Sequence, residues 1–416
     1  MKKNISFNLI GASFPIIAAI FSIPLLIEEI GLEKFGSLTL IWALVGYFGL
    51  FDLGLGKSLT LRLVQIGSAS AFKKEKSVVC WTALIVLSLL ATIVAISLLL
   101  VATTLNLSED DYIAACYVSV GLIITMVANA FRGMLESIAK FGVINLIRSP
   151  LGVYNYVAPL LVAMFISTEV SSLTFCLVVG RLCSLLIMIF VTLSMFKPLR
   201  SYPSLSMIEM KNLISYGGWL TVSNSVSPLI GYVDRFVIAS MLGTKQLSYY
   251  VTPQEMMNKL AVIPGAVTSV VFPILGRNYA SGEKNAAKNS VFNASIYLFL
   301  LLFPLILILV IYAELILALW IGDVLASKSA FFLQIFAIGS YLNFMMHIPY
   351  VALQSMGLSK LLAKIHIVEL LLYIPILYFL ISFFGLNGAV MSWAIRMVLD
   401  AILICFFYYM KNIKND

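Results

Sequence analysis

Seven basic side chains lie inside the hydrophobic stretches of this chain, where charges are uncommon. They are Lys57, Arg62, Arg148, Arg181, Arg235, Lys259 and Arg396. Five acidic side chains lie at similar depth: Asp52, Asp234, Glu255, Glu369 and Asp400. A charge in the hydrocarbon core is costly unless it is paired or hydrated, so each marks a candidate functional position. Because basic residues outnumber acidic ones, the set favours an anionic substrate.

Some of these charges have obvious partners nearby in the sequence. Glu255 with Lys259, and Arg396 with Asp400, are separated by four residues, so each pair lies on one helix face and could form a structural ion pair. Arg62 lies near the end of its stretch, where we expect it to reach the membrane surface. Setting these aside leaves Lys57, Arg148, Arg181 and Arg235 against Asp52, Asp234 and Glu369, an excess of one positive charge.

Arginine binds phosphate oxygens through two parallel hydrogen bonds, so the deep arginines indicate phosphate recognition. The candidate substrate-binding residues are therefore Lys57, Arg148, Arg181, Arg235, Lys259 and Arg396. The candidates for coupling to an ion, or for balancing charge, are Asp52, Asp234, Glu255, Glu369 and Asp400. Structural pairing of the same charges is the alternative.

The chain carries no motif typical of catalysis. It has no G-x-x-x-x-G-K-[ST] loop, no H-E-x-x-H and no G-x-S-x-G. The five cysteines show no metal-ligand spacing, and we expect structural roles for His347 and His366. The sequence therefore predicts neither an enzyme nor a bound cofactor or metal.

The elements that hold these charges are membrane helices. The composition is 61% hydrophobic and 11% charged, whereas soluble domains have about 25% charged residues. Apolar stretches of about 20 residues can each cross a hydrocarbon core of about 30 Å. Twelve such stretches are predicted: 5–27, 36–63, 78–104, 112–134, 141–166, 171–196, 212–242, 247–275, 289–312, 329–353, 359–382 and 386–410.

The connecting segments predict the orientation, because Lys and Arg concentrate on the cytoplasmic side. With the N-terminus inside, seventeen basic residues fall in inner segments and only Lys34, Lys245 and Lys328 in outer ones. Both termini are therefore expected in the cytoplasm, and the net charge of +8 reflects topology. The first stretch lacks a cleavage site of the A-x-A type, so we expect it to be retained as a helix.

The stretches divide into two predicted six-helix bundles, residues 1–196 and 212–416, joined by a cytoplasmic linker at 197–211. A turn at 31–36 follows the first stretch, and a similar turn at 243–248 follows the seventh. Pro15 and Pro228 precede these turns at nearly the same offset. Such a repeat relates two halves of some transporters.

Several segments resemble the Wzx-type O-antigen flippases. The strongest is Phe51-Asp52-Leu53-Gly54-Leu55-Gly56-Lys57-Ser58-Leu59-Thr60, which is similar to the family's FDLGLGxALT stretch. The 31–36 turn and Val233-Asp234-Arg235-Phe236 are similar as well. Lys57 stands where the family usually has arginine, so it can supply the charge but not the two-pronged geometry.

This resemblance implies an all-α integral membrane fold like that of the multidrug and toxin extrusion (MATE) transporters. Two six-helix bundles would flank a cavity that opens alternately to each side of the bacterial inner membrane. The cargo would be an undecaprenyl-diphosphate-linked oligosaccharide, moved to the outer leaflet during lipopolysaccharide synthesis. An H+ or Na+ gradient would drive transport, and a polysaccharide polymerase and chain-length proteins would be partners.

Three alternatives remain open at this point. A MATE-like, cation-coupled multidrug exporter would need an acidic cavity, whereas the deep charge here is slightly positive. A membrane polysaccharide polymerase or ligase would usually have a large outer loop, and no connection here is long enough. A flippase for peptidoglycan precursors would have more nearly fourteen helices.

Overall fold

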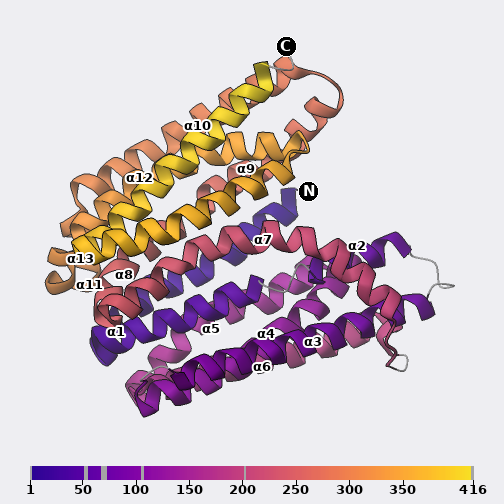
Figure 1. The fold of residues 1–416 in the computed structure, drawn as a ribbon, viewed down its shortest axis with the longest axis horizontal. Helices are drawn as coiled ribbons and strands as arrows, with labels where there is room; N and C mark the ends of the chain where they lie inside the picture. The colour runs from indigo at the N-terminus through magenta and orange to yellow at the C-terminus, as the bar shows by residue number, and fades with distance from the viewer. Residues whose placement is uncertain (1, 51–54, 67–72, 105–106, 201–202, 414–416) are drawn as a thin grey trace. The chain divides into compact units, whose positions relative to one another are not determined.

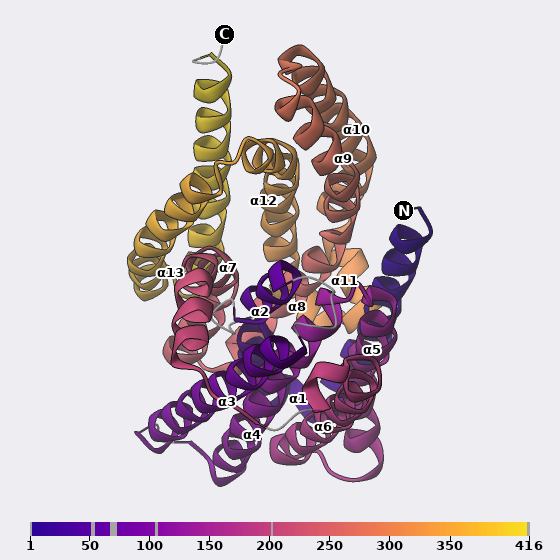
Figure 2. The same cartoon turned by 90° about the vertical axis from the view of Figure 1, so that its right-hand side faces the viewer.

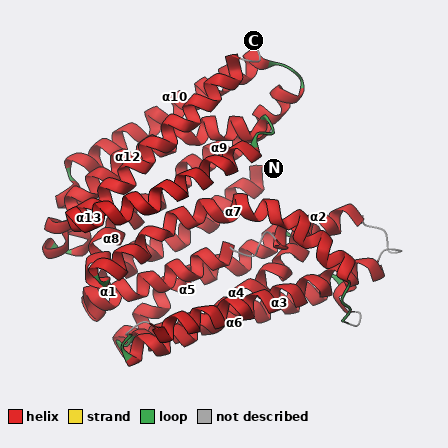
Figure 3. Ribbon diagram, viewed as in Figure 1, coloured by secondary structure: helices red, strands yellow, loops and turns green. Residues whose placement is uncertain are grey.

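We describe a computed structural model of the 416-residue chain. The structure describes residues 2–50, 55–66, 73–104, 107–200 and 203–413. Within these ranges the ordered segments are helices joined by short connections (Figure 3). The predicted all-α membrane fold is confirmed.

The chain forms two compact units, and the first covers Met1–Leu229. It contains α1 (Lys2–Leu50), α2 (Leu55–Ile66), α3 (Lys73–Thr104), α4 (Glu109–Ser137), α5 (Phe141–Phe165), α6 (Val170–Met195), the 3-10 helix η2 (Lys197–Arg200) and the first part of α7 (Met207–Leu242). Within this unit α1 packs against α5, and α4 packs against α2, α3 and α6 (Figure 1).

The second unit covers Ile230–Asp416 and includes the end of α7. The following helices are α8 (Thr244–Leu260), α9 (Val262–Ala280), α10 (Lys284–Ile311), α11 (Ala313–Ile321), α12 (Asp323–Ser355) and α13 (Ser359–Ile413). Helix α12 packs against α8, α9, α10, α11 and α13 (Figure 2). It is therefore the helix around which this unit is organised. The predicted bundle boundary at 197–211 stays a prediction.

Two of the helices are too long to be single membrane spans. At a rise of about 1.5 Å per residue, the 49 residues of α1 would extend about 74 Å, more than twice a hydrocarbon core of about 30 Å. Both α1 and the 55-residue α13 are interrupted at a glycine with positive φ, Gly31 (φ 75°) and Gly385 (φ 56°). Only glycine adopts such backbone angles readily, so each glycine separates two helical arms.

Ten of the twelve predicted stretches coincide with one helix or with one arm of α1 or α13, and the other two each cover parts of two helices. In the described part of the chain, eight helical segments are long and apolar enough to cross a membrane, and α1 and α13 each count once among them despite their kinks. Stretch 36–63 continues from α1 into α2, and stretch 247–275 contains α8 and α9. The sequence missed α11, whose nine residues are too short to span a bilayer.

The glycine-containing segment after Asp52 lies where two helices approach closely. A Cβ atom on Gly133 of α4 would lie 2.6 Å from the carbonyl oxygen of Gly56 on α2. The Thr60 hydroxyl is 3.0 Å from the carbonyl oxygens of both Gly56 and Gly133. This geometry supports the interpretation of the segment as a helix-packing contact.

Candidate functional site

The second unit contains a buried polar cluster between α7 and α8, here called the α7–α8 cluster. It consists of Asp234, Arg235, Tyr250, Gln254, Glu255 and Lys259. Arg235 is 2% exposed, and its Nη2 lies 2.7 Å from Glu255 Oε1 and 3.2 Å from Gln254 Oε1. Its guanidinium also lies 5.5 Å from the centre of the Tyr232 ring.

Asp234 in the same cluster is fully buried and is held by three donors. Its carboxylate accepts hydrogen bonds from the Tyr250 hydroxyl at 2.7 Å, the Gln254 amide at 3.2 Å and the Arg235 backbone N–H at 2.8 Å. Glu255 forms a second ion pair, at 3.2 Å, with Lys259 four residues later. Two acidic and two basic side chains therefore balance, which fits a role for Asp234 and Glu255 in neutralising the two cations.

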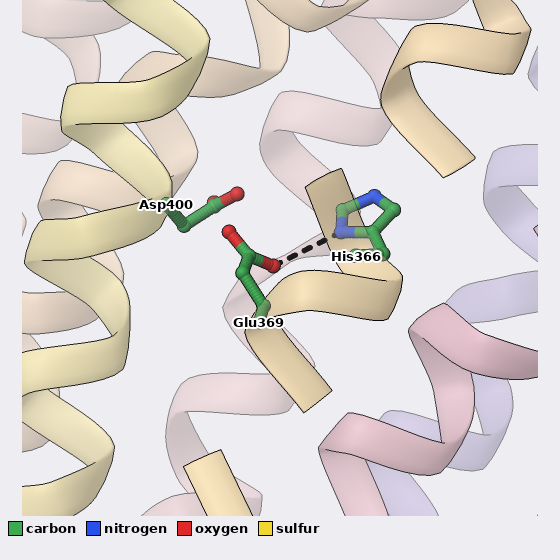
Figure 4. A group of neighbouring side chains, drawn as sticks. All are labelled: His366, Glu369 and Asp400. Atoms are coloured by element: carbon green, nitrogen blue, oxygen red, sulfur yellow. Dashed lines mark hydrogen bonds and ion pairs between the residues drawn. The ribbon is translucent and has the colours of Figure 1, made fainter. Parts of the chain in front are cut away.

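A second cluster lies on α13, here called the carboxylate cluster: His366, Glu369 and Asp400. The three residues come from both arms of α13, since Gly385 separates Asp400 from the other two. Figure 4 shows the Asp400 and Glu369 carboxylates pointing toward each other, with the His366 ring beside Glu369. One ligand atom from each residue lies within 4.8 Å of the others, and His366 Nδ1 is 3.1 Å from Glu369 Oε2.

Arg396 does not form the expected i,i+4 ion pair with Asp400. Its guanidinium instead lies 5.2 Å from the centre of the Tyr373 ring, a cation–π arrangement. Asp400 accepts a hydrogen bond at 2.9 Å from the Asn343 amide of α12. The spacing permitted the pair, but the Tyr373 ring and the Asn343 amide provide other partners.

The first unit holds Arg181, whose surroundings are nearly apolar. Arg181 is 8% exposed, and Nη1 donates one hydrogen bond of 2.8 Å to the Leu177 carbonyl on the same helix. No carboxylate among the described residues pairs with it. Arg148 on α5 is exposed and likewise makes no ion pair within the described ranges.

Arg62 has two acidic partners that the sequence did not predict, and the expectation that it reaches the membrane surface stays a prediction. Its guanidinium makes two hydrogen bonds to the Glu209 carboxylate, of 2.7 and 3.0 Å, and a third of 3.3 Å to Glu75. Helices α2, α3 and α7 are thereby joined. Glu209 and Glu75 precede or follow the apolar stretches, so the sequence pattern placed them in loops.

Two predicted site residues lie outside what the structure describes: Asp52 entirely, and Lys57 with respect to its side chain. Sequence reasoning also missed polar partners, namely Tyr250, Gln254, Asn343 and His366. One signal was readable in the sequence. His366 and Glu369 are three residues apart and share a helix face, as do Tyr250 and Gln254 at a spacing of four.

The chain is similar in sequence to two protein families and to one full-length relative. The family model described as "Polysaccharide biosynthesis protein" matches residues 1–279, and the model described as "MatE" matches residues 220–379. A Shigella flexneri protein, named as a proposed O-antigen transporter, is 31% identical over 98% of this chain and 97% of its own length.

Solved structures show the same fold at low identity. An inward-facing multidrug resistance MATE family transporter of the MOP superfamily superposes with a TM-score of 0.79 at 14% identity, covering 98% of each chain. A MOP superfamily transporter from Pyrococcus furiosus gives a TM-score of 0.67 at 13% identity, over 100% of this chain and 96% of its own. Together with the family match over residues 1–279 and the full-length relative, these findings show that the chain belongs to the polysaccharide biosynthesis protein family.

Proposed function

We propose that this protein is a flippase, a transport protein rather than an enzyme. It moves an undecaprenyl-diphosphate-linked oligosaccharide from the cytoplasmic to the outer leaflet by alternating access. The observation that carries this proposal is the 31% identity to an O-antigen transporter homologue along 98% of the chain. A polymerase and chain-length proteins, which act on the product, are the partners that this role implies.

The buried charges support an anionic cargo. Within the α7–α8 cluster, Arg235 and Lys259 are balanced by Asp234 and Glu255. Arg148, Arg181 and Arg396, in contrast, form no ion pair with a described residue. A guanidinium without a carboxylate partner is suited to bind a diphosphate or an acidic sugar. We therefore propose these three arginines, with Lys57, as the main substrate contacts.

The function can be tested in cells that depend on this protein for surface polysaccharide. Deleting the gene should abolish the polysaccharide and leave the lipid-linked oligosaccharide accessible only from the cytoplasmic side, and a plasmid copy should restore both. Export of organic cations without any effect on polysaccharide would instead support the multidrug alternative.

We propose that both termini lie in the cytoplasm and that the protein resides in the inner membrane. In a background without the five native cysteines, Glu109→Cys should react with an impermeant thiol reagent added outside, and Lys284→Cys should react only after lysis. Both side chains are exposed. The neighbouring Asp110 is less suitable, because its carboxylate accepts hydrogen bonds from the Val170 and Ser171 backbone N–H groups at the start of α6. The opposite labelling pattern would reverse the orientation.

Transport coupled to an H+ or Na+ gradient needs an acidic residue that can exchange its cation. Glu369 and Asp400 fit this role better than Asp234 and Glu255, because Glu369 Oε1 and Asp400 Oδ1 are buried without a hydrogen-bond partner. We expect Glu369→Gln to slow gradient-driven flipping at normal protein level, and the exposed Glu314→Gln to have no effect. Flipping by Glu369→Gln that still responds fully to collapse of the gradient would exclude Glu369 as the coupling residue.

A further inference from the structure

The carboxylate cluster holds two buried carboxyl groups, and within the described residues neither is in contact with a Lys or Arg side chain. Glu369 and Asp400 are each 7% exposed. No Lys or Arg nitrogen among the described residues lies within 4.0 Å of either carboxylate. Arg396, the nearest basic residue on α13, is directed over the Tyr373 ring. Two ionised carboxylates in an apolar interior are strongly disfavoured unless a bound cation or a proton neutralises them.

The donor atoms of the cluster already converge. His366 Nδ1 and Glu369 Oε2 are 3.1 Å apart, and Asp400 contributes an oxygen within 4.8 Å of both. Two ligands of one tetrahedral metal ion, each about 2.1 Å from it, lie about 3.4 Å apart, which is close to the His366–Glu369 separation. Glu369 Oε1 and Asp400 Oδ1 are buried and have no hydrogen-bond partner, so both oxygens have lone pairs available to a cation.

We infer that His366, Glu369 and Asp400 form a binding site for one divalent transition-metal ion such as Zn2+. The combination of one imidazole nitrogen with carboxylate oxygens suits such an ion, whereas Mg2+ and Ca2+ prefer oxygen ligands alone. One divalent ion also neutralises the two carboxylates fully. Three protein ligands leave a fourth position for water or for another donor.

Residues of α12 contact two of the three proposed ligands. The Asn343 amide on α12 donates to Asp400 Oδ2 at 2.9 Å, which fixes the orientation of that carboxylate. The Tyr350 ring, also on α12, lies 5.9 Å from the His366 ring. Because His366 and Glu369 precede Gly385 and Asp400 follows it, a bound ion would join the two arms of α13 and hold them together.

The experiment uses the full-length protein purified in detergent, with any affinity tag removed and metals stripped by a chelator. Zn2+ is titrated by calorimetry, and Co2+ by its visible absorption. We expect one ion per chain and a higher melting temperature with Zn2+. Glu369→Gln, Asp400→Asn and His366→Gln should each weaken binding by at least about tenfold, and Asn343→Ala by about 10- to 100-fold.

Two variants serve as matched controls. His347→Gln removes the only other histidine, whose ring faces Phe344, and Glu314→Gln removes an exposed carboxylate of the same unit. Both should bind Zn2+ like the unmodified protein. The inference is overturned if the unmodified protein binds no metal, or if all three ligand variants that elute as folded protein bind it equally well. A melting temperature that responds to pH but not to Zn2+ would show that protonation, and not a metal ion, neutralises Glu369 and Asp400, and it would also overturn the inference. None of these results depends on the cargo, so a failure here leaves the proposed flippase function untouched. Binding of Zn2+ as inferred here would exclude the alternative use of Glu369 as the H+ or Na+ coupling residue.

Discussion

Arg181→Ala should leave lipid-linked oligosaccharide on the cytoplasmic leaflet while the protein accumulates at its normal level. Among the described residues, the Arg181 guanidinium is bonded only to the Leu177 carbonyl of its own helix, so its removal leaves none of their buried carboxylates without a partner. Loss of a charged hydrogen bond to phosphate costs about 1.5–3 kcal/mol, or about 10- to 150-fold in affinity. The amount of surface polysaccharide reports transport, and the accessibility of the lipid-linked sugar from each side reports the leaflet that holds it. Immunoblots of the membrane fraction report the protein level.

Arg181→Lys provides the matched control, since lysine keeps the charge but loses the two-pronged geometry. We expect partial recovery of surface polysaccharide in this variant. A low level of Arg181→Ala protein would indicate a bracing role for the arginine. Normal polysaccharide at a normal protein level would contradict the proposed substrate contact.

Asp234→Ala should have the opposite signature, a severe loss of folded protein. The substitution leaves the Tyr250 hydroxyl and the Gln254 amide without their acceptor and removes a negative charge beside the buried Arg235. Breaking a buried charged interaction by deleting one partner costs about 3–5 kcal/mol. The yield of monodisperse protein in detergent and its thermal melting midpoint measure this loss.

Asp234→Asn and Tyr250→Phe separate charge from hydrogen bonding at this position. Asp234→Asn keeps one acceptor oxygen, and Tyr250→Phe removes a single donor, so both should be milder than Asp234→Ala. If Asp234→Ala protein were as stable as the unmodified chain but inactive, Asp234 would be an ion-coupling residue instead of a charge-balancing one.

Much of the architecture could be predicted because hydropathy alone determines which segments enter a membrane. The stretches on either side of Gly31 and of Gly385 were separated correctly, although the helices run through both glycines with only a kink. Helix α11 was missed because its nine residues, apolar except for Glu314, follow α10 after a single residue, so hydropathy does not separate the two.

The pairing of buried charges was less predictable, because sequence spacing describes only one helix at a time. Glu255 and Lys259 pair as expected, yet Glu255 also binds Arg235 from another helix. The Arg396–Asp400 spacing is the same, but packing places an aromatic ring and an amide closer to these side chains. Contacts between helices decide such cases, and a single sequence does not contain them.

The contacts of Arg62 have a consequence for the order of events during synthesis. Glu75 follows Arg62 by 13 residues, whereas Glu209 follows it by 147. At about 5–20 residues per second, a ribosome needs roughly 7–30 s to reach Glu209 after Arg62. During that interval Glu75 is already synthesised and Glu209 is not. Glu75 would therefore neutralise the Arg62 charge on α2 until α7 is synthesised.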